Sequence, residues 1–388
     1  MCLLFVCHQQ PGGRTECQSF PECGDSVKGA IWVENFRFQR KAYGEIWLMP
    51  GVKITGIGSS IPTRRITNQQ WEKLVPTTDL WIQENIGIKE RSRIEADRTT
   101  TDMGEESAKL ALEMAGVKGE EIDFIICATN SQDHLYPSTA SKIQTRLGAK
   151  KASSLDVQAG CTGWLFAMRL GTSLVQSGES KNVLVIGSDA LSRALNFNDR
   201  STVLFGDGSG SALLQADSNP DSSKKLTSPL FYTGTEPSLA MQQPTIYQEQ
   251  FNALEDYLAG KDMDHLKRPL PSMDGKASLK LALTKSREAI DAIFTKAAEF
   301  GIKQSDLNAY IPHQTNVHVI KALCEHTGFP FEKIPFTLEK YGGISTAGLP
   351  TGLCEHLKNG FLKKGDLVLC TGYGAGFTYG AMLFYWTI

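Results

Sequence analysis

From Val52 onward, short strand-like runs alternate with helix-like runs, and this alternation is typical of an α/β fold. In the first half, strands are predicted at Val52 to Ile57, Ile122 to Ala128, Leu155 to Val157, Val183 to Ile186 and Gly210 to Gln215. A helix is predicted at Thr101 to Ala115, where Thr99 and Asp102 offer capping chemistry. In the second half, helices are predicted at residues 278–300 and Val317 to His326, and strands at Ala309 to Pro312 and Leu367 to Cys370.

The composition fits an enzyme with a sizeable core. The chain has 388 residues, of which 41% are hydrophobic and 21% charged, enough for two packed halves or one large α/β domain. A formal net charge of −2 offers no footprint for nucleic acid or anionic lipid. No apolar run approaches the ~18 residues needed to cross a bilayer. We therefore expect a soluble protein with no nucleic-acid partner and no membrane span.

The cysteines indicate a reducing environment. There are nine, an odd number, and their scattered spacing offers neither paired disulfides nor a metal-binding Cys-x-x-Cys. We expect free thiols, no metal and a cytoplasmic location.

The chain divides into four predicted segments. Residues 1–48 contain four cysteines and no clear periodicity, and we expect a leader or extension outside the core, with Met49 as the functional start; a true interaction tail is the alternative. Residues 49–216 and 273–388 are expected to form two similar halves. Residues 217–272 are polar and uneven, and we expect them to connect the halves and supply part of a pocket mouth or dimer surface.

Each half closes with a glycine triplet, Gly206, Gly208, Gly210 in the first and Gly372, Gly374, Gly376 in the second. A dinucleotide fingerprint would need Gly-x-Gly-x-x-Gly between a strand and a helix. Both triplets instead run into strand-like residues. We therefore expect no nicotinamide or flavin cofactor, and glycines that let backbones approach closely.

Cys161 lies between the strand-like run Ala152 to Val157 and a helix-like run from Thr162 to Val175. A thiol at the start of a helix meets the positive end of the helix dipole, which favours the reactive thiolate. A buried structural cysteine is the alternative for this residue taken alone.

A series of ordered motifs surrounds Cys161. They are Ile54-Thr55-Gly56-Ile57-Gly58, Thr77 to Ile82, Gly87 to Arg91, Tyr136 to Ala140, Phe205 to Ala212, Met273-Asp274-Gly275, Ile311 to Asn316 and Gly374 to Gly380. With these motifs the sequence resembles the ketoacyl-acyl carrier protein synthase III family of thiolase-like condensing enzymes, from about residue 50 to the end. The resemblance implies a thiolase-like fold, in which two duplicated halves form a layered αβαβα arrangement, and a homodimer.

The resemblance also implies a reaction. It makes the protein an acyltransferase of fatty acid biosynthesis in which Cys161 takes an acyl group from acyl-coenzyme A. A malonyl group on an acyl carrier protein then loses carbon dioxide and attacks the acyl-cysteine. The backbone N–H groups of Cys161 and Ala375 are the implied oxyanion donors. Trp81, Arg200 and Asn316 are the implied substrate contacts, and coenzyme A takes part as a substrate, with no further cofactor.

His313 is the candidate base among seven histidines. It follows the predicted strand Ala309 to Pro312, and strand ends of α/β sheets are where ligands bind. It also matches the catalytic histidine of the family. For His326 and His356 a solvated surface is the better interpretation, and His134 has no evident partner.

The sequence departs from the family at a catalytic position. Family members carry an asparagine in a Tyr-Gly-Asn-Thr-Ser segment, whose amide helps the histidine stabilise the enolate formed by decarboxylation. Here the segment reads Tyr341-Gly342-Gly343-Ile344-Ser345, so Gly343 replaces the amide. Losing one such donor typically slows a reaction ~10²- to 10³-fold. Either His313 and water support decarboxylation, or the protein does not decarboxylate malonyl groups.

Three smaller departures accompany Gly343. Asn85 and His318 stand where basic residues are usual in the family. Basic residues bind the phosphates of the acyl donor and the acidic carrier protein, so a different donor or carrier is an alternative. Thr315 replaces a more usual alanine, and we expect little consequence.

Three functions follow. The first is condensation of an acyl-coenzyme A with a malonyl thioester. The second is an acyltransferase that keeps Cys161 and His313 but passes the acyl group to a non-malonyl nucleophile. The third is a non-catalytic partner subunit, against which the presence of both reactive residues argues.

Overall fold

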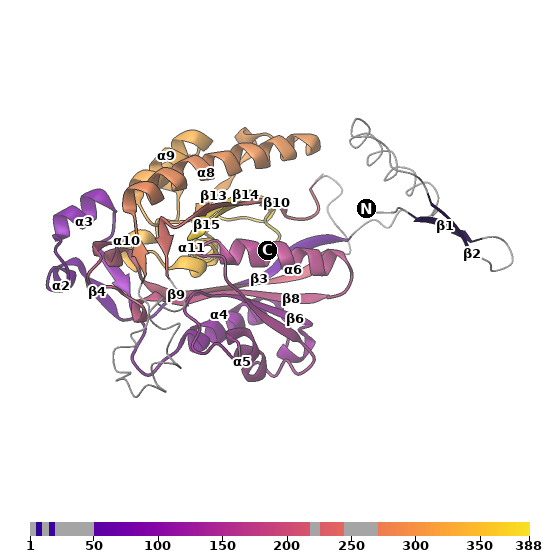
Figure 1. Ribbon diagram of the computed structural model, residues 1–388, viewed down its shortest axis with the longest axis horizontal. Coiled ribbons are helices and arrows are strands. Elements are labelled where there is room, and N and C mark those ends of the chain that lie inside the picture. Colours follow the sequence, from indigo (N-terminus) through magenta and orange to yellow (C-terminus); the bar gives the residue numbers. More distant parts are fainter. Residues whose placement is uncertain (1–4, 10–14, 20–49, 218–225, 244–270) are drawn as a thin grey trace. The chain divides into compact units, whose positions relative to one another are not determined.

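The computed structural model describes residues 5–9, 15–19, 50–217, 226–243 and 271–388 (Figure 1). The chain divides into two compact units, Met1–Met49 and Pro50–Ile388. In the first unit, β1 (Phe5–Gln9) and β2 (Thr15–Ser19) pair antiparallel. The sequence analysis predicted neither of these strands, because residues 1–48 show no clear periodicity. Met49, the predicted functional start, lies outside the described residues.

The first sheet of the second unit has five strands in the order β3-β9-β8-β6-β7. Their bounds are Gly51–Ser60 for β3, Asp207–Asp217 for β9, Asn182–Ala190 for β8, Phe124–Ala128 for β6 and Ser153–Val157 for β7. The β3–β9 and β9–β8 pairs are antiparallel, and β8–β6 and β6–β7 are parallel. All five strands contain predicted strand residues, so the alternating pattern identified each of them.

The second sheet repeats this arrangement with four strands in the order β10-β15-β14-β13. Their bounds are Leu230–Ser238 for β10, Gly376–Tyr385 for β15, Leu367–Gly374 for β14 and Ala309–Pro312 for β13. Two antiparallel pairs are again followed by a parallel pair. The matching connectivity indicates two duplicated halves. β10 lies in the segment predicted to connect the halves, so part of that segment belongs to the second sheet.

The helices form three layers around the two sheets (Figure 1). The outer face of the first sheet is covered by α4 (Thr100–Ala115) and α5 (Thr139–Arg146). Between the sheets lie α6 (Gly163–Gln176) and α11 (Gly348–Lys358). The outer face of the second sheet is covered by α8 (Gly275–Ala297) and α9 (Val317–Thr327). The predicted αβαβα layering is confirmed.

The central helix layer is apolar and fixes the position of the site. Trp164 and Leu165 of α6 share one buried cluster with Leu349 and Leu353 of α11 and with strands of both sheets. Burying side chains of this size contributes roughly 1.5–3 kcal/mol each. The starts of both helices are therefore held firmly, and α6 begins two residues after Cys161.

The starts of two helices are set by capping residues. Thr99 and Asp102 form the predicted capping box of α4, with Asp102 N donating to Thr99 Oγ1 at 3.3 Å and Thr99 N donating to Asp102 Oδ2 at 2.6 Å. Helix α8 begins before the predicted residue 278, because the Asp274 carboxylate accepts from the backbone of Lys276 and Ala277, each at 3.0 Å.

Shorter elements complete the second unit. They are β4 (Arg65–Thr67), α2 (Asn68–Trp71), α3 (Asp79–Asn85), β5 (Glu90–Ser92), β11 (Met241–Gln242), β12 (Ser272–Met273), α10 (Leu338–Tyr341) and 3₁₀ turns at Gly119–Glu121, Leu191–Arg193, Arg200–Leu204, Ala298–Phe300, Gln304–Asp306, Phe331–Lys333 and Ser345–Ala347. Among the described helices, none combines the length and apolar character that a membrane crossing requires.

Candidate active site

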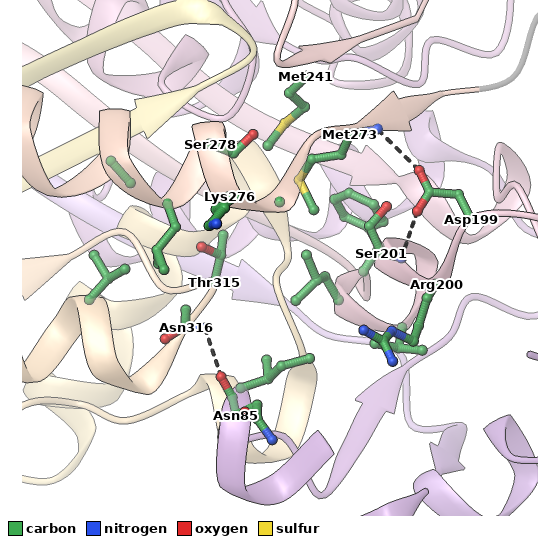
Figure 2. Close-up of a pocket in the computed structure, with 18 of the residues that line it drawn as sticks. Asn85, Asp199, Arg200, Ser201, Met241, Met273, Lys276, Ser278, Thr315 and Asn316 are labelled. Carbon is green, nitrogen blue, oxygen red and sulfur yellow. Dashed lines mark hydrogen bonds between the residues drawn. The ribbon is translucent and has the colours of Figure 1, made fainter. Parts of the chain in front are cut away.

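A cavity of about 530 Å³ has Cys161 in its lining. Its walls come from α3, the Arg200–Leu204 turn, the β11–β12 pair, α8, the start of α9 and the ends of β14 and β15 (Figure 2). Cys161 is 9% exposed, whereas Arg200 and Lys276 of the same lining are exposed. The thiol therefore lies at the inner end of a pocket whose outer end carries two cations.

Cys161 sits in a tight turn between β7 and α6. Gly160 has φ 55°, in the left-handed region, and Thr162 is the N-cap of α6. Gly374 at the end of β14 packs against this turn, because a Cβ there would lie 2.4 Å from the backbone nitrogen of Cys161. A Cβ on Gly160 would likewise lie 2.6 Å from the nitrogen of Ala375. The two residues predicted to supply oxyanion N–H groups thus lie on adjoining backbones.

Burial changes the protonation of Cys161. It raises the pKa of the thiol to about 11; a side-chain hydrogen bond from Ser345 acts in the opposite direction, and the nearby Asp189 carboxylate raises the pKa further. This corrects the expectation that the helix dipole favours the thiolate form of Cys161. The cost of burying a charged thiolate away from water exceeds the stabilisation that the start of α6 gives it. Cys161 is therefore a thiol at neutral pH.

A polar network lies behind Cys161 and was not predicted from the sequence. The buried Asp189 carboxylate, at the end of β8, accepts from Asn130 N at 2.7 Å and from Thr346 Oγ1 at 2.8 Å. Asn130 Nδ2 in turn donates to Gly160 O at 3.2 Å and to Ser345 Oγ at 3.3 Å. The network links the turn before Cys161 to the Ser345–Ala347 turn, from segments far apart in the sequence.

His313 follows β13 and is 1% exposed. Its backbone N–H donates to Thr371 O at 2.7 Å, and its ring meets the ring of Tyr373 edge-on at a centroid distance of 5.2 Å. Within the described part of the chain, neither ring nitrogen has a hydrogen-bond partner. Burial lowers the pKa of His313 to about 4, so the ring is neutral at pH 7 and able to accept a proton.

The segment from Gly343 to Gly348 lies against both predicted catalytic residues. Ser345 hydrogen-bonds Cys161, and a Cβ on Gly348 would lie 3.4 Å from His313 Nδ1. Tyr373 contacts the His313 ring and lines the cavity whose lining also includes Cys161. The fold thus gathers Cys161, His313 and the Gly343 segment in one place.

Gly343 is held by backbone bonds on both sides. Its N–H donates to Leu204 O at 2.7 Å, and its carbonyl accepts from Gly206 N at 3.1 Å. Its neighbour Gly342 (φ 71°) and Ser345 (φ 49°) lie in the left-handed region, whereas Gly343 does not. A Cβ on Gly343 would lie 3.2 Å from Leu204 O, a tight contact that a small shift relieves.

The predicted substrate contacts lie in the outer part of the cavity. The Arg200 guanidinium lies 4.1 Å from the centre of the Trp81 ring. Asp199 supports this arrangement by accepting from Ser201 N at 2.8 Å and Met273 N at 3.1 Å (Figure 2). Lys276 provides a second cation that sequence analysis missed, and its place in the first turn of α8 became evident only from the fold.

Asn316 also lines the cavity, but its amide is partly engaged. Its Nδ2 donates to Asn85 O at 2.8 Å (Figure 2), and its Oδ1 accepts from His318 N at 2.8 Å as the N-cap of α9. Asn316 therefore joins α9 to α3 at the cavity wall. His318 reaches Glu84 O through Nε2 at 2.9 Å.

The other histidines lie elsewhere. His356 is 3% exposed, with its ring against Phe361, which corrects the prediction of a solvated surface for that residue. His326 contacts Asp291 at 2.7 Å, and His134 lies 3.3 Å from Lys142 Nζ. The side chain of His8 and all of His265 lie outside the described residues.

Comparisons with known proteins agree with this architecture. Family models for 3-oxoacyl-(acyl-carrier-protein) synthase III match residues 155–231, and the C-terminal model of the same family matches residues 297–386. The beta-ketoacyl-(acyl-carrier-protein) synthase III of Clostridium perfringens strain SM101 is 39% identical over 343 residues, covering 86% of this chain and 99% of the relative. The enzyme of the same name from Aquifex aeolicus is 37% identical over 334 residues, with the same coverage.

Solved structures give the same result. The crystal structure of the Aquifex aeolicus VF5 synthase III has a TM-score of 0.75 and 35% identity, covering 87% of this chain and all of that chain. The priming beta-ketosynthase of the R1128 polyketide biosynthetic pathway has a TM-score of 0.76 and 27% identity, covering 87% of this chain and 97% of that chain.

Proposed function

This chain belongs to the 3-oxoacyl-(acyl-carrier-protein) synthase III family of condensing enzymes, and we propose that Cys161 and His313 carry out its chemistry. Cys161 takes an acyl group from an acyl-coenzyme A. The acyl group then condenses with a malonyl group on an acyl carrier protein to give a 3-oxoacyl thioester.

The protonation states define the first step. Cys161 is a thiol and His313 a neutral imidazole at pH 7, because burial raises the pKa of one and lowers that of the other. As the sulfur attacks the thioester carbonyl, His313 accepts the thiol proton. The carbon–sulfur bond of the donor then breaks, and coenzyme A leaves as a thiol with that proton. The N–H groups of Cys161 and Ala375 are the proposed donors to the oxyanion.

The position of Cys161 carries this proposal. A thiol at the inner end of a 530 Å³ cavity is reachable by a long, thin substrate and shielded from bulk water. Arg200 and Lys276 at the outer end suit the phosphates of coenzyme A, and the Trp81 ring suits its adenine. The proposed reaction uses side chains and substrate alone, with no other cofactor.

Two exposed features support a homodimer. β7 is the edge strand of the first sheet, and Leu155 on it is 39% exposed. Leu135 and Tyr136 are 79% and 84% exposed. An open strand edge and exposed large apolar groups are surfaces that a second copy covers. We also propose a cytoplasmic location, since five cysteines of the second unit are free thiols: Cys127, Cys161, Cys324, Cys354 and Cys370.

Intact-mass measurement tests the role of Cys161. Incubation with acyl-coenzyme A is expected to add one acyl group to the unmodified protein and none to Cys161→Ala. Cys370→Ala is the matched control, because that thiol is buried in β14 outside the cavity lining. Acylation that persists in Cys161→Ala would remove this residue from the mechanism.

His313→Ala tests the base. It is expected to slow acyl transfer ~10²-fold or more, the usual effect of losing a positioned acid or base. His356→Ala is the matched control, since His356 is also buried but its ring packs against Phe361, whereas the His313 ring packs against Tyr373 of the cavity lining. Equal rates for His313→Ala and the unmodified protein would contradict the assignment.

Gly343 favours a second candidate function, in which the acyl group passes from Cys161 to an amine, alcohol or thiol. The missing amide affects enolate formation and not thioester attack. Acyl transfer to such a nucleophile, with no carbon dioxide released, would identify this alternative. Cys161 and His313 together argue against a purely structural partner subunit.

A further inference from the structure

Two hydroxyl groups lie beside the position that lacks the amide. Thr315 Oγ1 and Tyr373 OH are 2.6 Å apart, and both residues line the cavity that contains Cys161. A Cβ on Gly343 would lie 3.8 Å from the Thr315 methyl carbon. Thr315 therefore borders the space that an asparagine side chain at residue 343 would enter, and its hydroxyl contact places Tyr373 next to it.

The ring of Tyr373 is fixed on two sides. It meets the His313 ring edge-on, with centroids 5.2 Å apart and an interplanar angle of 78°. It also stacks on Phe377, with centroids 6.2 Å apart and an interplanar angle of 6°. Tyr373 is 5% exposed. A donor on this ring is preorganised next to the proposed base, which is what makes a hydrogen bond effective in a transition state.

One of the two hydroxyl protons of the Thr315–Tyr373 pair is not used in the contact between them. Each hydroxyl can donate one hydrogen bond, and the contact between them uses only one of the two protons. When Thr315 donates to the Tyr373 oxygen, the Tyr373 O–H remains free for a substrate. Burial raises the pKa of Tyr373 well above its usual value, so this hydroxyl stays protonated at working pH.

We propose that the Tyr373 hydroxyl, oriented by Thr315, donates a hydrogen bond to the malonyl thioester oxygen during decarboxylation and so replaces the missing asparagine amide. Tyr373 is then a catalytic residue, and Thr315 is a positioning residue. The inference rests on the condensing function proposed above. It also revises the expectation that Thr315 has little consequence.

The chemical step balances without a further reactant. The bond between the malonyl Cα and the carboxylate carbon breaks, carbon dioxide leaves, and the electron pair passes to the Cα and the thioester oxygen. The Cα then attacks the acyl carbonyl on Cys161. The carbon–sulfur bond to Cys161 breaks, and the released thiolate takes up one proton from solvent. The Tyr373 proton stays on its oxygen throughout.

Two half-reactions, measured separately, test the inference. Acylation of Cys161 is followed by intact mass, and carbon dioxide release from a malonyl-acyl carrier protein is measured on the acylated enzyme. Tyr373→Phe is expected to leave acylation within a few-fold of normal and to slow carbon dioxide release ~10²-fold. Thr315→Val is expected to slow release roughly 10-fold, and Thr315→Ser to keep nearly normal release.

Tyr310 and Thr371 offer a matched control. Their hydroxyls form a similar buried pair, 2.9 Å apart, that does not line the cavity. Tyr310→Phe removes the same chemical group at the same depth and is expected to leave carbon dioxide release unchanged. In addition, Gly343→Asn is expected to restore part of the release lost in Tyr373→Phe, whereas Gly343→Ala is not.

The outcomes separate the inference from the proposed function. Normal carbon dioxide release by Tyr373→Phe overturns the inference alone. Unmodified protein that acylates Cys161 but releases no carbon dioxide overturns both the condensing function and the inference. If Tyr373→Phe loses acylation as well, the Thr315→Val and Thr315→Ser pair decides, and equal release by those two variants overturns the inference.

Discussion

At the scale of single residues, the reacting groups are buried and neutral. Cys161 and His313 have pKa values of about 11 and about 4, and burial is the leading cause of both shifts. A neutral thiol and a neutral imidazole react by proton transfer during attack, and not through a thiolate formed beforehand.

We predict that the rate of Cys161 acylation is nearly constant from pH 5 to pH 9. Acylation requires neutral His313, and with a pKa of about 4 the ring protonates only below pH 5. An ordinary histidine with a pKa of ~6.5 would lose roughly 30-fold in rate at pH 5. Reaction through a free thiolate would instead raise the rate ~10-fold per pH unit.

Rapid mixing with acyl-coenzyme A after a pH jump, with intact-mass readout, measures the profile before any slow unfolding. A rate that halves near pH 6.5, or one that rises steadily with pH, would contradict the neutral pair.

At the scale of elements, the site depends on the end of β14 packing against the turn that holds Cys161. A Cβ on Gly374 would lie 2.4 Å from the backbone nitrogen of Cys161, closer than atoms can approach. The neighbouring Gly372 is less restricted, since its Cβ would first meet a side-chain methyl of Thr162 at 3.0 Å.

Gly374→Ala is therefore expected to displace the Cys161 turn and slow acylation at least ~10²-fold, because small misplacements of reacting groups are costly. Gly372→Ala is the control in the same strand and is expected to keep acylation within ~10-fold of normal. Both are measured by intact mass alongside circular dichroism. Equal acylation by the two variants would show that the close backbone contact is not needed.

The elements also show how far sequence reasoning reaches. Alternating apolar runs located every strand of the first sheet, because burial on a sheet leaves a local pattern. The predicted ends of the elements were less accurate. Helix α8, for example, is capped by Asp274 and begins before the predicted residue 278. The β1–β2 hairpin was missed.

Some parts of the site could be predicted from the sequence and others could not. The motifs of Cys161 and His313 are local, so the sequence pointed to both. The bonds of Asp189 to Asn130 and Thr346, and of Thr315 to Tyr373, join distant segments and appear only once the chain has folded. The pKa of Cys161 was predicted in the wrong direction, because the depth of burial is set by the whole core.

At the scale of the whole molecule, buried histidines make the fold sensitive to acid. His313 and His356 each have a pKa lowered by burial to about 4. Above pH ~6.5 each ring is neutral in both folded and unfolded chains. Below it, the unfolded chain binds a proton that the folded chain does not bind until about pH 4. Stability is therefore present above pH ~6.5 and is lost as the pH falls toward 4.

We predict that each of these histidines lowers the free energy of unfolding by roughly 2 kcal/mol between pH 7 and pH 5. His356→Gln removes one of the two, so its loss between these pH values is expected to be about 2 kcal/mol smaller than that of the unmodified protein. Denaturant unfolding at both pH values measures this difference, and the cost of the substitution itself cancels. An identical pH dependence in both proteins would contradict a buried neutral His356.

The most direct test of the account is a single-turnover balance on the acylated enzyme. Protein carrying one acyl group on Cys161 is mixed with malonyl-acyl carrier protein, and the acyl-protein, carbon dioxide and 3-oxoacyl product are quantified together. The proposed mechanism predicts that one acyl group leaves Cys161 for each carbon dioxide released and each 3-oxoacyl product formed. An acyl group that remains on the protein, or that leaves without carbon dioxide and without a 3-oxoacyl product, would contradict it.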